Sequence, residues 1–438
     1  MPPKQADRKK TKQKPTSKPQ RTPRQPSKQP RKLNTSNNDN DSNTSIDFDT
    51  PIPLQLQQLT LDIFKSALLP TNPAASTSAS ASASEETPET ERELDTKTLI
   101  QTIKSHLYQR DFDSAFTDAG EDLLRAYALR WSAARALGYA GLFRGVLQWM
   151  RGECLTRRKT VCPTRVICIG GGAGAEIVAL AGAWRALEFG LGGLEDGLGA
   201  LSLGDEGGNE KEKETKGENE AGTQIQDPVV KLGLSVAAVD IADWSGVVRR
   251  LEKTIASDAV PALRSSEYQP PLVPVDGDGN GNGKFSVSFQ RADILGIPEN
   301  ELKDVFLEED SIEHSLLVTL MFTLNELFST SMAKATGFLL QMTEILPSNA
   351  VLLVVDSPGS YSTLKMGRDK DGNPVERNYP MKFLLDHTLL SVAEGKWERI
   401  YTQDSRWWRR DAERLRYEVG EGAGLEDMRF QLHLYRRL

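Results

Sequence analysis

The spacing of apolar and polar residues along this 438-residue chain predicts alternating strands and helices. Continuous apolar runs at 166–169 and 350–355 are typical of buried strands, whereas "WSGVVRRLEKTI" at 244–255 has the apolar spacing of a helix. Between the two runs we expect a second strand at 234–240, a third at 285–293 and a fourth within 315–328. Two late segments, at 397–408 and 429–437, again have the pattern of strands. Such alternation predicts a doubly wound α/β sheet, with the late strand pair as an antiparallel edge.

The N-terminal part of the chain has a different pattern. Residues 54–69 and 97–150 have helical spacing, and the Ser- and Ala-rich tract at 71–90 between them is typical of a linker. We therefore expect a disordered basic tail at 1–50, a short helical segment with the linker at 51–92, a helical N-terminal cap at 93–160, and an α/β domain at 161–438 that carries a Gly- and Glu-rich insertion at about 188–227 and a glycine loop at 276–284.

Positive charge is concentrated in the tail. Residues 1–33 hold twelve Lys or Arg against one acid and so carry a charge of +11. Because the net charge of the whole chain is −7, the remaining residues carry about −18. A segment so poor in apolar residues cannot offset the entropy of ordering it. Basic tails of this kind are typical of nuclear or nucleolar proteins, and they bind RNA phosphates without reading sequence.

The remaining composition argues against several kinds of site. Cys154, Cys162 and Cys168 form an odd set without paired spacing, which predicts reduced thiols, and four scattered histidines offer no zinc cluster. The glycine loop resembles the start of a calcium-binding loop, but Val287 stands where that loop needs a bidentate acid. We expect no metal, no signal peptide and no membrane span, and an intracellular monomer.

The glycines at 170–174, between a strand and a helix, predict a turn that binds a ligand. Their backbone can approach the ligand closely, and the helix that follows presents free N–H groups. No Lys-Ser or Lys-Thr closes the turn, which excludes a P-loop. Gly170 and Gly172 fit a dinucleotide turn when read with Ala175, and an S-adenosylmethionine turn when read with Gly174.

Two acids favour S-adenosylmethionine. Asp240 ends the second strand, where both folds use an acid to bind ribose hydroxyls. Asp293 ends the third strand, where methyltransferases place an acceptor for the adenine amino group, and no second mononucleotide-binding half follows. Cys168 replaces the acid that many of these enzymes carry before the turn. Glu176 is therefore a candidate for the cofactor's amino group or ribose, or it interacts only with the helix dipole.

Several distinctive segments together carry a family resemblance. "LRAYALRWSAARALGY", "VICIGGGAGAE", "LVTLMFTLNELFSTS", "LLVVDSPGSYS" and "SRWWRRD" resemble the fungal large-subunit ribosomal RNA uridine-N3 methyltransferases, from about residue 97 onward apart from the insertions. The resemblance implies a Rossmann-like class I fold and an S-adenosylmethionine-dependent enzyme. It also implies ribosomal RNA or a pre-ribosome as partner, and a nuclear or nucleolar location, with the cytoplasm also open.

A target site is expected after the fourth strand. The three cysteines lie before or inside the first strand, which argues against a cysteine nucleophile for carbon methylation and favours a nitrogen or oxygen target. "NELF" occupies the position of the Asn-Pro-Pro-aromatic motif of amino methyltransferases, without its prolines. We expect Asn325 to bind the uracil edge, Phe328 or Tyr361 to stack on the extruded base, and Glu326 or Asp356 to take the proton.

Further RNA contacts are expected on two surfaces. Trp407 and Arg409 in "SRWWRRD" combine a stacking ring with charge, and Arg130 with Arg135 in the helical cap could meet phosphates. Packing into the core is the alternative for each of these side chains, as it is for Phe328. Three other functions remain open: a protein methyltransferase, a ribosome-assembly factor that binds S-adenosylmethionine or RNA without turnover, and a nicotinamide-dependent oxidoreductase.

Overall fold

The computed structural model of the protein describes residues 46–69, 94–158, 162–200, 233–273, 285–307, 314–359, 361–368, 374–421 and 423–438. Side chains are described in these ranges except at 189–200 and 361–377. The predictions for the tail up to residue 45, the linker, the insertion beyond residue 200 and the glycine loop therefore lie outside the described residues.

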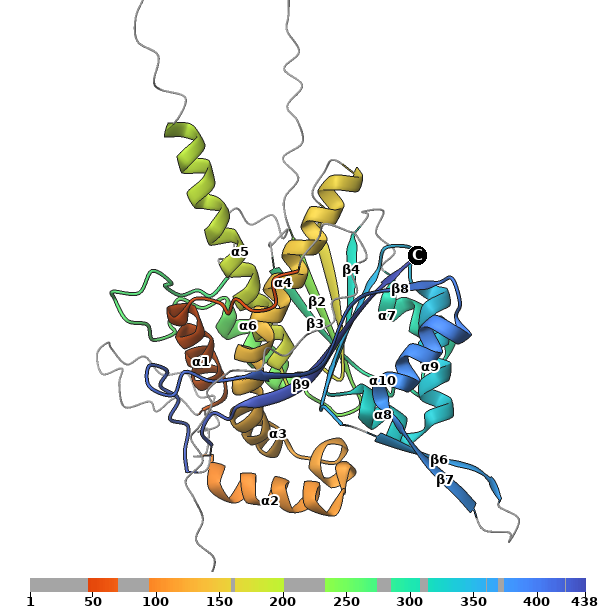
Figure 1. Ribbon diagram of the computed structural model, residues 1–438. Helices are drawn as coiled ribbons and strands as arrows, with labels where there is room; N and C mark the ends of the chain where they lie inside the picture. Colours follow the sequence, from red (N-terminus) through yellow and green to blue (C-terminus); the bar gives the residue numbers. More distant parts are fainter. Residues whose placement is uncertain are drawn as a thin grey trace, which may run out of the picture. The chain divides into compact units, whose positions relative to one another are not determined.

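The described strands form a seven-stranded sheet and a separate two-stranded hairpin (Figure 1). The sheet order is β3-β2-β1-β4-β5-β9-β8; the first five strands are parallel, and β9 runs antiparallel to both β5 and β8. The doubly wound α/β sheet and its antiparallel edge are thus confirmed. The strands are β1 (Thr164–Ile169), β2 (Leu234–Asp240), β3 (Phe285–Arg291), β4 (Ser315–Met321), β5 (Val351–Asp356), β6 (Tyr361–Arg368), β7 (Pro374–Pro380), β8 (Trp397–Trp408) and β9 (Met428–Arg437).

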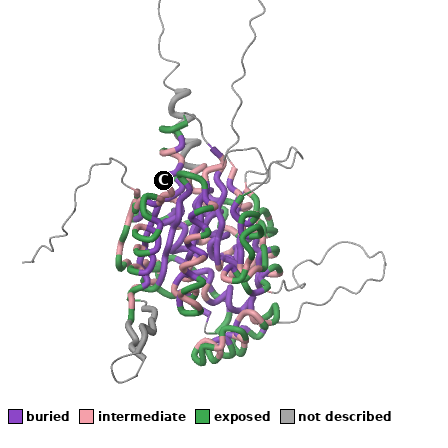
Figure 2. The backbone as a smooth tube through the Cα atoms, turned by 90° about the vertical axis from the view of Figure 1, so that its right-hand side faces the viewer, coloured by how far each residue is buried: buried purple, intermediate pink, exposed green. Residues whose placement is uncertain are grey.

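Helices cover both faces of the sheet. One face packs against α1, α4, α5 and α6, and the other against α7, α8, α9 and α10. Figure 2 shows the buried strands between helices whose outer sides are exposed. The helices are α1 (Leu54–Leu68), α2 (Thr96–Gln109), α3 (Glu121–Tyr127), α4 (Ala133–Arg158), α5 (Ala175–Ala200), α6 (Ser245–Ile255), α7 (Glu299–Phe306), α8 (Leu324–Thr330), α9 (Met332–Ile345) and α10 (Met381–Asp386), with π-helical turns η2 (Asp113–Thr117), η3 (Ala128–Ser132) and η4 (His387–Val392). None of the helices in the described ranges is long and apolar enough to cross a membrane.

The burial of the strands explains their sequence patterns. All residues of β1 and β5 are buried, as expected for central strands covered on both faces, and this is why their sequences are continuous apolar runs. The edge strand β3 alternates instead between half-buried and exposed positions. Because β1, β2, β4 and β5 are parallel, their carboxyl ends lie together along one edge of the sheet.

The fold begins earlier than the sequence predicts. Residues 46–50, which we assigned to the tail, form an N-terminal strap that packs on the core. Phe48 is buried, with its ring centroid 4.8 Å from that of Tyr401, and the backbone oxygen of Phe48 accepts a hydrogen bond from Arg406. Asp47 forms an ion pair with Arg144 of α4 at 2.6 Å. Ile46 and Phe48 alternate with two acids in this short segment, which was too little sequence signal to predict the packing.

Two other boundaries differ from expectation. Helix α5 continues to Ala200, into the segment assigned to the insertion from residue 188. The chain after β5 forms the β6–β7 hairpin, which the sequence pattern did not predict and which contacts α8 and α10 (Figure 1). Residues 54–69 and 97–150 are helical as predicted, with two π-helical turns in the second segment.

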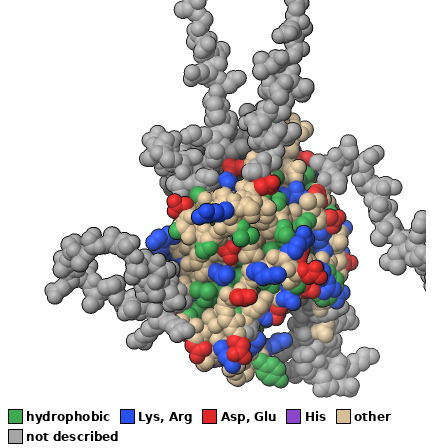
Figure 3. All heavy atoms as spheres, turned by 90° about the vertical axis from the view of Figure 1, so that its left-hand side faces the viewer, with side chains coloured by type: hydrophobic (Ala, Val, Ile, Leu, Met, Phe, Trp, Pro, Cys, Tyr) green, Lys and Arg blue, Asp and Glu red, His purple; other side chains and the backbone are tan. Residues whose placement is uncertain are grey.

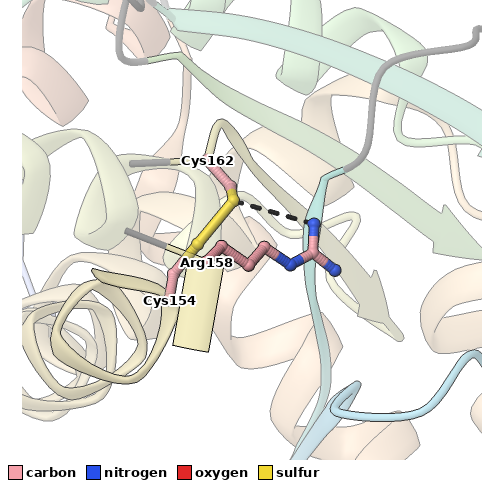
Figure 4. Close-up of a disulfide and its surroundings, with 3 residues drawn as sticks. All are labelled: Cys154, Arg158 and Cys162. Carbon is pink, nitrogen blue, oxygen red and sulfur yellow. Dashed lines mark hydrogen bonds between the residues drawn. A yellow bond between two sulfur atoms is a disulfide. The ribbon is translucent and has the colours of Figure 1, made fainter. Parts of the chain in front are cut away.

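The prediction of three reduced thiols is wrong for two of them. Cys154, near the end of α4, is joined to Cys162, just before β1, by a disulfide (Figure 4). Arg158 lies beside it and donates to Cys162 Sγ at 3.8 Å. The chain reverses between α4 and β1 and so brings the two residues together, which their spacing in sequence does not reveal. Cys168 is a free, buried thiol.

Candidate active site

The glycine turn lies at the carboxyl edge of the sheet, directly after β1. Gly170 has a φ of +76°, and a Cβ there would lie 2.5 Å from Thr323 Oγ1, so only glycine fits. A Cβ on Gly172 would meet the indole ring of Trp244 and the side chain of Asp240. Gly174, with a φ of +82°, leads into α5. Neighbouring side chains thus pack directly against this turn, which we call the cradle, and leave no room for a Cβ at Gly170 or Gly172.

Asp240 is held against this cradle at the end of β2. Its Oδ2 accepts a hydrogen bond from the backbone N–H of Gly172, and its Oδ1 from that of Ala242, both at 3.1 Å. Burial raises the pKa of the Asp240 carboxyl, although these bonds oppose the shift. Asp293 is exposed beyond the end of β3, where its carboxylate accepts from the backbone of Leu295 at 2.9 Å.

Glu176 lies under the turn and not toward the ligand side. Thr319 Oγ1 donates to Glu176 Oε1 at 2.5 Å, and Cys168 lies beside the same carboxyl group. Burial raises the pKa of Glu176 to about 8 and also raises the pKa of the Cys168 thiol. Because its carboxyl group is enclosed by β1 and β4, Glu176 supports the turn. Of the two alternatives for Glu176, contact with the cofactor is thus not supported, since the carboxyl group is enclosed by Thr319 and Cys168.

Glu176 should make stability depend on pH. Its ordinary pKa is 4.5, so between pH 4.5 and about 8 the folded state holds a proton that the unfolded state has released. The free energy of unfolding should therefore fall across this window, by roughly 3–5 kcal/mol from this group. Glu176→Gln should remove most of that fall. Denaturant unfolding at pH 5 and pH 8 measures the free energy of unfolding of both proteins. An equal fall between the two pH values in the unchanged protein and in Glu176→Gln would contradict the raised pKa of Glu176.

Asn325 and Asp356 lie together where β4 and β5 end. Asp356 Oδ2 accepts from the backbone N–H of Asn325 at 2.9 Å, and Oδ1 from that of Ser357 at 2.7 Å. Burial raises the pKa of Asp356 to about 6. The side-chain Oδ1 of Asn325 is buried, with no hydrogen-bond partner among the described residues. A buried acceptor without a donor is costly, so this oxygen is suited to bind a donor from a substrate.

Three other predicted target residues are placed differently. Phe328 is 2% exposed and packs in the core between the sheet and α9, so it cannot stack on a base. Glu326 is exposed on α8, next to Asn325 in the chain. Tyr361 begins β6, but its side chain lies outside the described part of the chain.

The arginines of the helical cap also correct the sequence analysis. Arg130 is buried, forms an ion pair with Glu426 and donates to the backbone oxygen of Gly424, so it is not available to RNA phosphates. Arg135 is half-buried and points inward, where its Nη1 donates to the Tyr127 hydroxyl at 2.9 Å. Arg130 therefore belongs to the interior of the helical cap, whereas Arg135 packs between the rings of Tyr127 and Phe322.

Trp407 and Trp408 lie at the end of β8 and have different surroundings. Trp408 lies against α4, next to Gly138. Trp407 is 50% exposed, with the guanidinium carbons of Arg409 and Arg429 at 4.0 and 5.8 Å from its ring centroid. Arg409 also forms an ion pair with Asp427, whereas exposed Arg429 makes none with a described residue. By contrast, the face of α1 and α6 intersperses basic and acidic side chains (Figure 3).

A wall of aromatic rings over the site escaped the sequence analysis. The ring centroids of Trp244 and Tyr127 are 5.7 Å apart. Arg135 donates a hydrogen bond to the Tyr127 hydroxyl, and its guanidinium carbon is 5.5 Å from the ring centroid of Phe322. Phe322 follows β4 with a φ of +59°, an unusual conformation for a bulky residue. The helical spacing of Tyr127 and Arg135 was visible in the sequence, but it did not reveal that they pack with Trp244 and Phe322.

Comparison with known proteins agrees with this geometry. A family model for SAM-dependent methyltransferases matches residues 81–436. The 25S rRNA (uridine(2843)-N(3))-methyltransferase of Saccharomyces cerevisiae is 30% identical over 344 residues, which cover 77% of this chain and 76% of that protein.

Solved structures give weaker matches. A SAM-dependent methyltransferase of Methanosarcina mazei is 9% identical, covering 65% of this chain and 97% of its own, with a TM-score of 0.28. The N-methyltransferase NodS of Bradyrhizobium japonicum, in complex with S-adenosylhomocysteine, is 10% identical, covering 66% and 86%, with a TM-score of 0.25. These scores are too low to support an argument. The assignment comes from the family model and the yeast relative: the chain belongs to the family of S-adenosylmethionine-dependent methyltransferases.

Proposed function

We propose that this methyltransferase acts on N3 of a uridine in large-subunit ribosomal RNA. The yeast relative carries out that reaction by its name, and it matches most of both chains. The observation within the site that supports the proposal is the buried Oδ1 of Asn325, an acceptor that lacks a donor among the described residues. The N3–H group of uracil, flanked by two carbonyl groups, is such a donor, so Asn325 would hold the base by this hydrogen bond until the proton passes to Asp356 and N3 is free to accept the methyl group.

The residues present fit the cofactor. The cradle has glycines where a Cβ would strike Thr323 or Trp244, and Asp240 stands beside it to accept hydrogen bonds from ribose hydroxyls. Exposed Asp293 would receive the adenine amino group. When bound, S-adenosylmethionine supplies an electrophilic methyl group on a sulfonium, so the protein has only to align the two reactants and remove one proton.

Asp356 is our candidate for the group that removes the N3 proton. It contacts the backbone of Asn325, and a pKa of about 6 leaves it mostly ionised at pH 7 while keeping it a stronger base than an ordinary aspartate. Neighbouring Glu326 is exposed and has no comparable backbone support. We therefore place proton transfer on Asp356 and keep Glu326 as the group to compare with it.

Trp407, Arg409 and Arg429 form our candidate RNA-binding surface, which we call the Trp407 surface. An exposed ring with two guanidinium groups over it combines base stacking with attraction to phosphates. The surface lies at the end of β8, beyond the carboxyl end of β5, on the same edge of the sheet as Asp356. RNA bound there would lie at the edge that holds the target site.

Trp407→Ala should weaken binding of single-stranded RNA by about tenfold or more, because one stacked base contributes about 1–3 kcal/mol. Fluorescence anisotropy with a labelled RNA measures the dissociation constant. Phe383→Ala is the matched control: Phe383 is 49% exposed on α10, and no arginine of the described chain lies over its ring. Equal effects of the two substitutions would remove the Trp407 surface from the proposal.

The basic N-terminal tail supports a nuclear or nucleolar site of action on ribosomal RNA or a pre-ribosome. We also propose that the protein acts as a monomer. To test the function, the gene is deleted and 3-methyluridine in large-subunit ribosomal RNA is quantified by nucleoside mass spectrometry. The modification should disappear and return with the intact protein, but not with Asp356→Asn. Unchanged 3-methyluridine in the deletion strain would overturn the proposed function.

A further inference from the structure

Arg135 occupies a position at the active edge that the assigned site residues do not explain. Its guanidinium group lies between two rings, 5.9 Å from the centroid of Tyr127 and 5.5 Å from that of Phe322, and it donates to the Tyr127 hydroxyl. Phe322 comes between β4 and Thr323, whose hydroxyl donates to the backbone of Ile169 beside the glycine turn. The cation is therefore held next to the cradle.

No carboxylate of a described residue forms an ion pair with Arg135. Other arginines of the helical cap are paired: Arg125 with Asp122, and Arg130 with Glu426. A guanidinium remains charged at any working pH, so Arg135 brings to the site a positive charge that no carboxylate of a described residue contacts directly. Such a charge, held by rings and one hydroxyl, still has donors for an anion.

The rest of the site is acidic. Asp240, Asp293 and Asp356 stand at or just after the ends of β2, β3 and β5, and they suit hydroxyl groups, an amino group and a leaving proton. S-adenosylmethionine has one anionic group, the carboxylate of its methionine part, and none of these acids can bind it. A planar guanidinium binds a carboxylate with two parallel hydrogen bonds.

The order of the rings along the wall indicates where this carboxylate would lie. Trp244 contacts the cradle next to Asp240, which is the ribose end of the site, and the wall continues through Tyr127 to Arg135 and Phe322 near Asn325. We propose that Arg135 binds the carboxylate of the methionine part of S-adenosylmethionine and so fixes the end of the cofactor that carries the methyl group. This inference rests on the cofactor, not on the RNA target, and the two proposals can fail separately.

The test compares two ligands by calorimetry on the full chain. S-adenosylhomocysteine carries the carboxylate, and 5′-methylthioadenosine lacks the whole amino acid part. Arg135→Gln should weaken binding of S-adenosylhomocysteine by about 10- to 100-fold and leave binding of methylthioadenosine unchanged. Arg135→Lys keeps the charge but not the planar guanidinium group. Its affinity for S-adenosylhomocysteine should lie between that of Arg135→Gln and that of the unchanged protein.

Arg144→Gln is the matched control, because Arg144 lies on the same helix but pairs with Asp47 of the strap. It should leave both affinities unchanged. Equal loss for both ligands in Arg135→Gln would mean that Arg135 only supports the fold of the cradle. Unchanged S-adenosylhomocysteine binding with slower methyl transfer would move its role to the RNA base. Either result overturns the proposal without touching the assignment of the uridine target.

Discussion

Asp356→Asn should lower the rate of methyl transfer by about 10²- to 10⁴-fold, because it removes the group that takes the N3 proton. The amide is nearly the same size, and its oxygen can keep one of the two hydrogen bonds with the backbone of Asn325 and Ser357. Affinity for S-adenosylhomocysteine should therefore change little. Single-turnover kinetics with saturating RNA separate the chemical step from binding.

The pH dependence of this step tests the base directly. Burial raises the pKa of Asp356 to about 6, and only the deprotonated carboxylate can accept the proton. In the unchanged protein the rate should rise with pH through about 6 and then level off, and in Asp356→Asn the residual rate should lack this step. If Glu326→Gln removed the step and Asp356→Asn kept it, the base would be Glu326.

Asp240→Ala should weaken binding of S-adenosylhomocysteine by about 10- to 100-fold. Hydrogen bonds from a ligand to a charged acceptor contribute about 1.5–3 kcal/mol each, and Asp240 also orders the turn by accepting from the N–H of Gly172. Removing it costs the ribose its acceptor and loosens the cradle. Titration calorimetry at constant pH measures the change.

Asp293→Ala is the control for Asp240→Ala, and the loss of affinity for S-adenosylhomocysteine is compared between the two variants. Asp293 is exposed and accepts from the backbone of Leu295, so the bond that it would offer to adenine competes with water. Its loss should cost less than tenfold in affinity. Equal losses at the two positions would show that burial of Asp240 gives it no special role, and no loss at either would place the cofactor elsewhere.

The sequence predicted the frame of the fold because the frame depends on local patterns. Continuous apolar runs identified β1 and β5, and alternating residues identified β8 and β9, since periodicity follows from which faces are covered. The β6–β7 hairpin was missed because its residues follow a good turn sequence and carry no strong alternation.

Side-chain roles were harder to predict than the frame. Gly170 and Asp240 could be placed at the glycine turn and at a strand end because backbone geometry there constrains the residue type. Phe328 and Arg130 could not, because helical spacing does not tell which side of a short helix faces a core or an acid such as Glu426. Nor does sequence indicate a residue like Phe322, whose unusual backbone is imposed by its tertiary surroundings.

The N-terminal strap makes residue 46, and not residue 51, the practical starting point for a shortened version of this protein. A chain that began at residue 51 would lose the Asp47–Arg144 ion pair on α4 and the Phe48 contacts with Tyr401 and Arg406 on β8. Tyr401 and Arg406 lie on the strand that carries Trp407. Trimming five residues far from the glycine turn in sequence would thus disturb the strand that presents the Trp407 surface, and an affinity tag fused there would need a spacer to leave the strap in place.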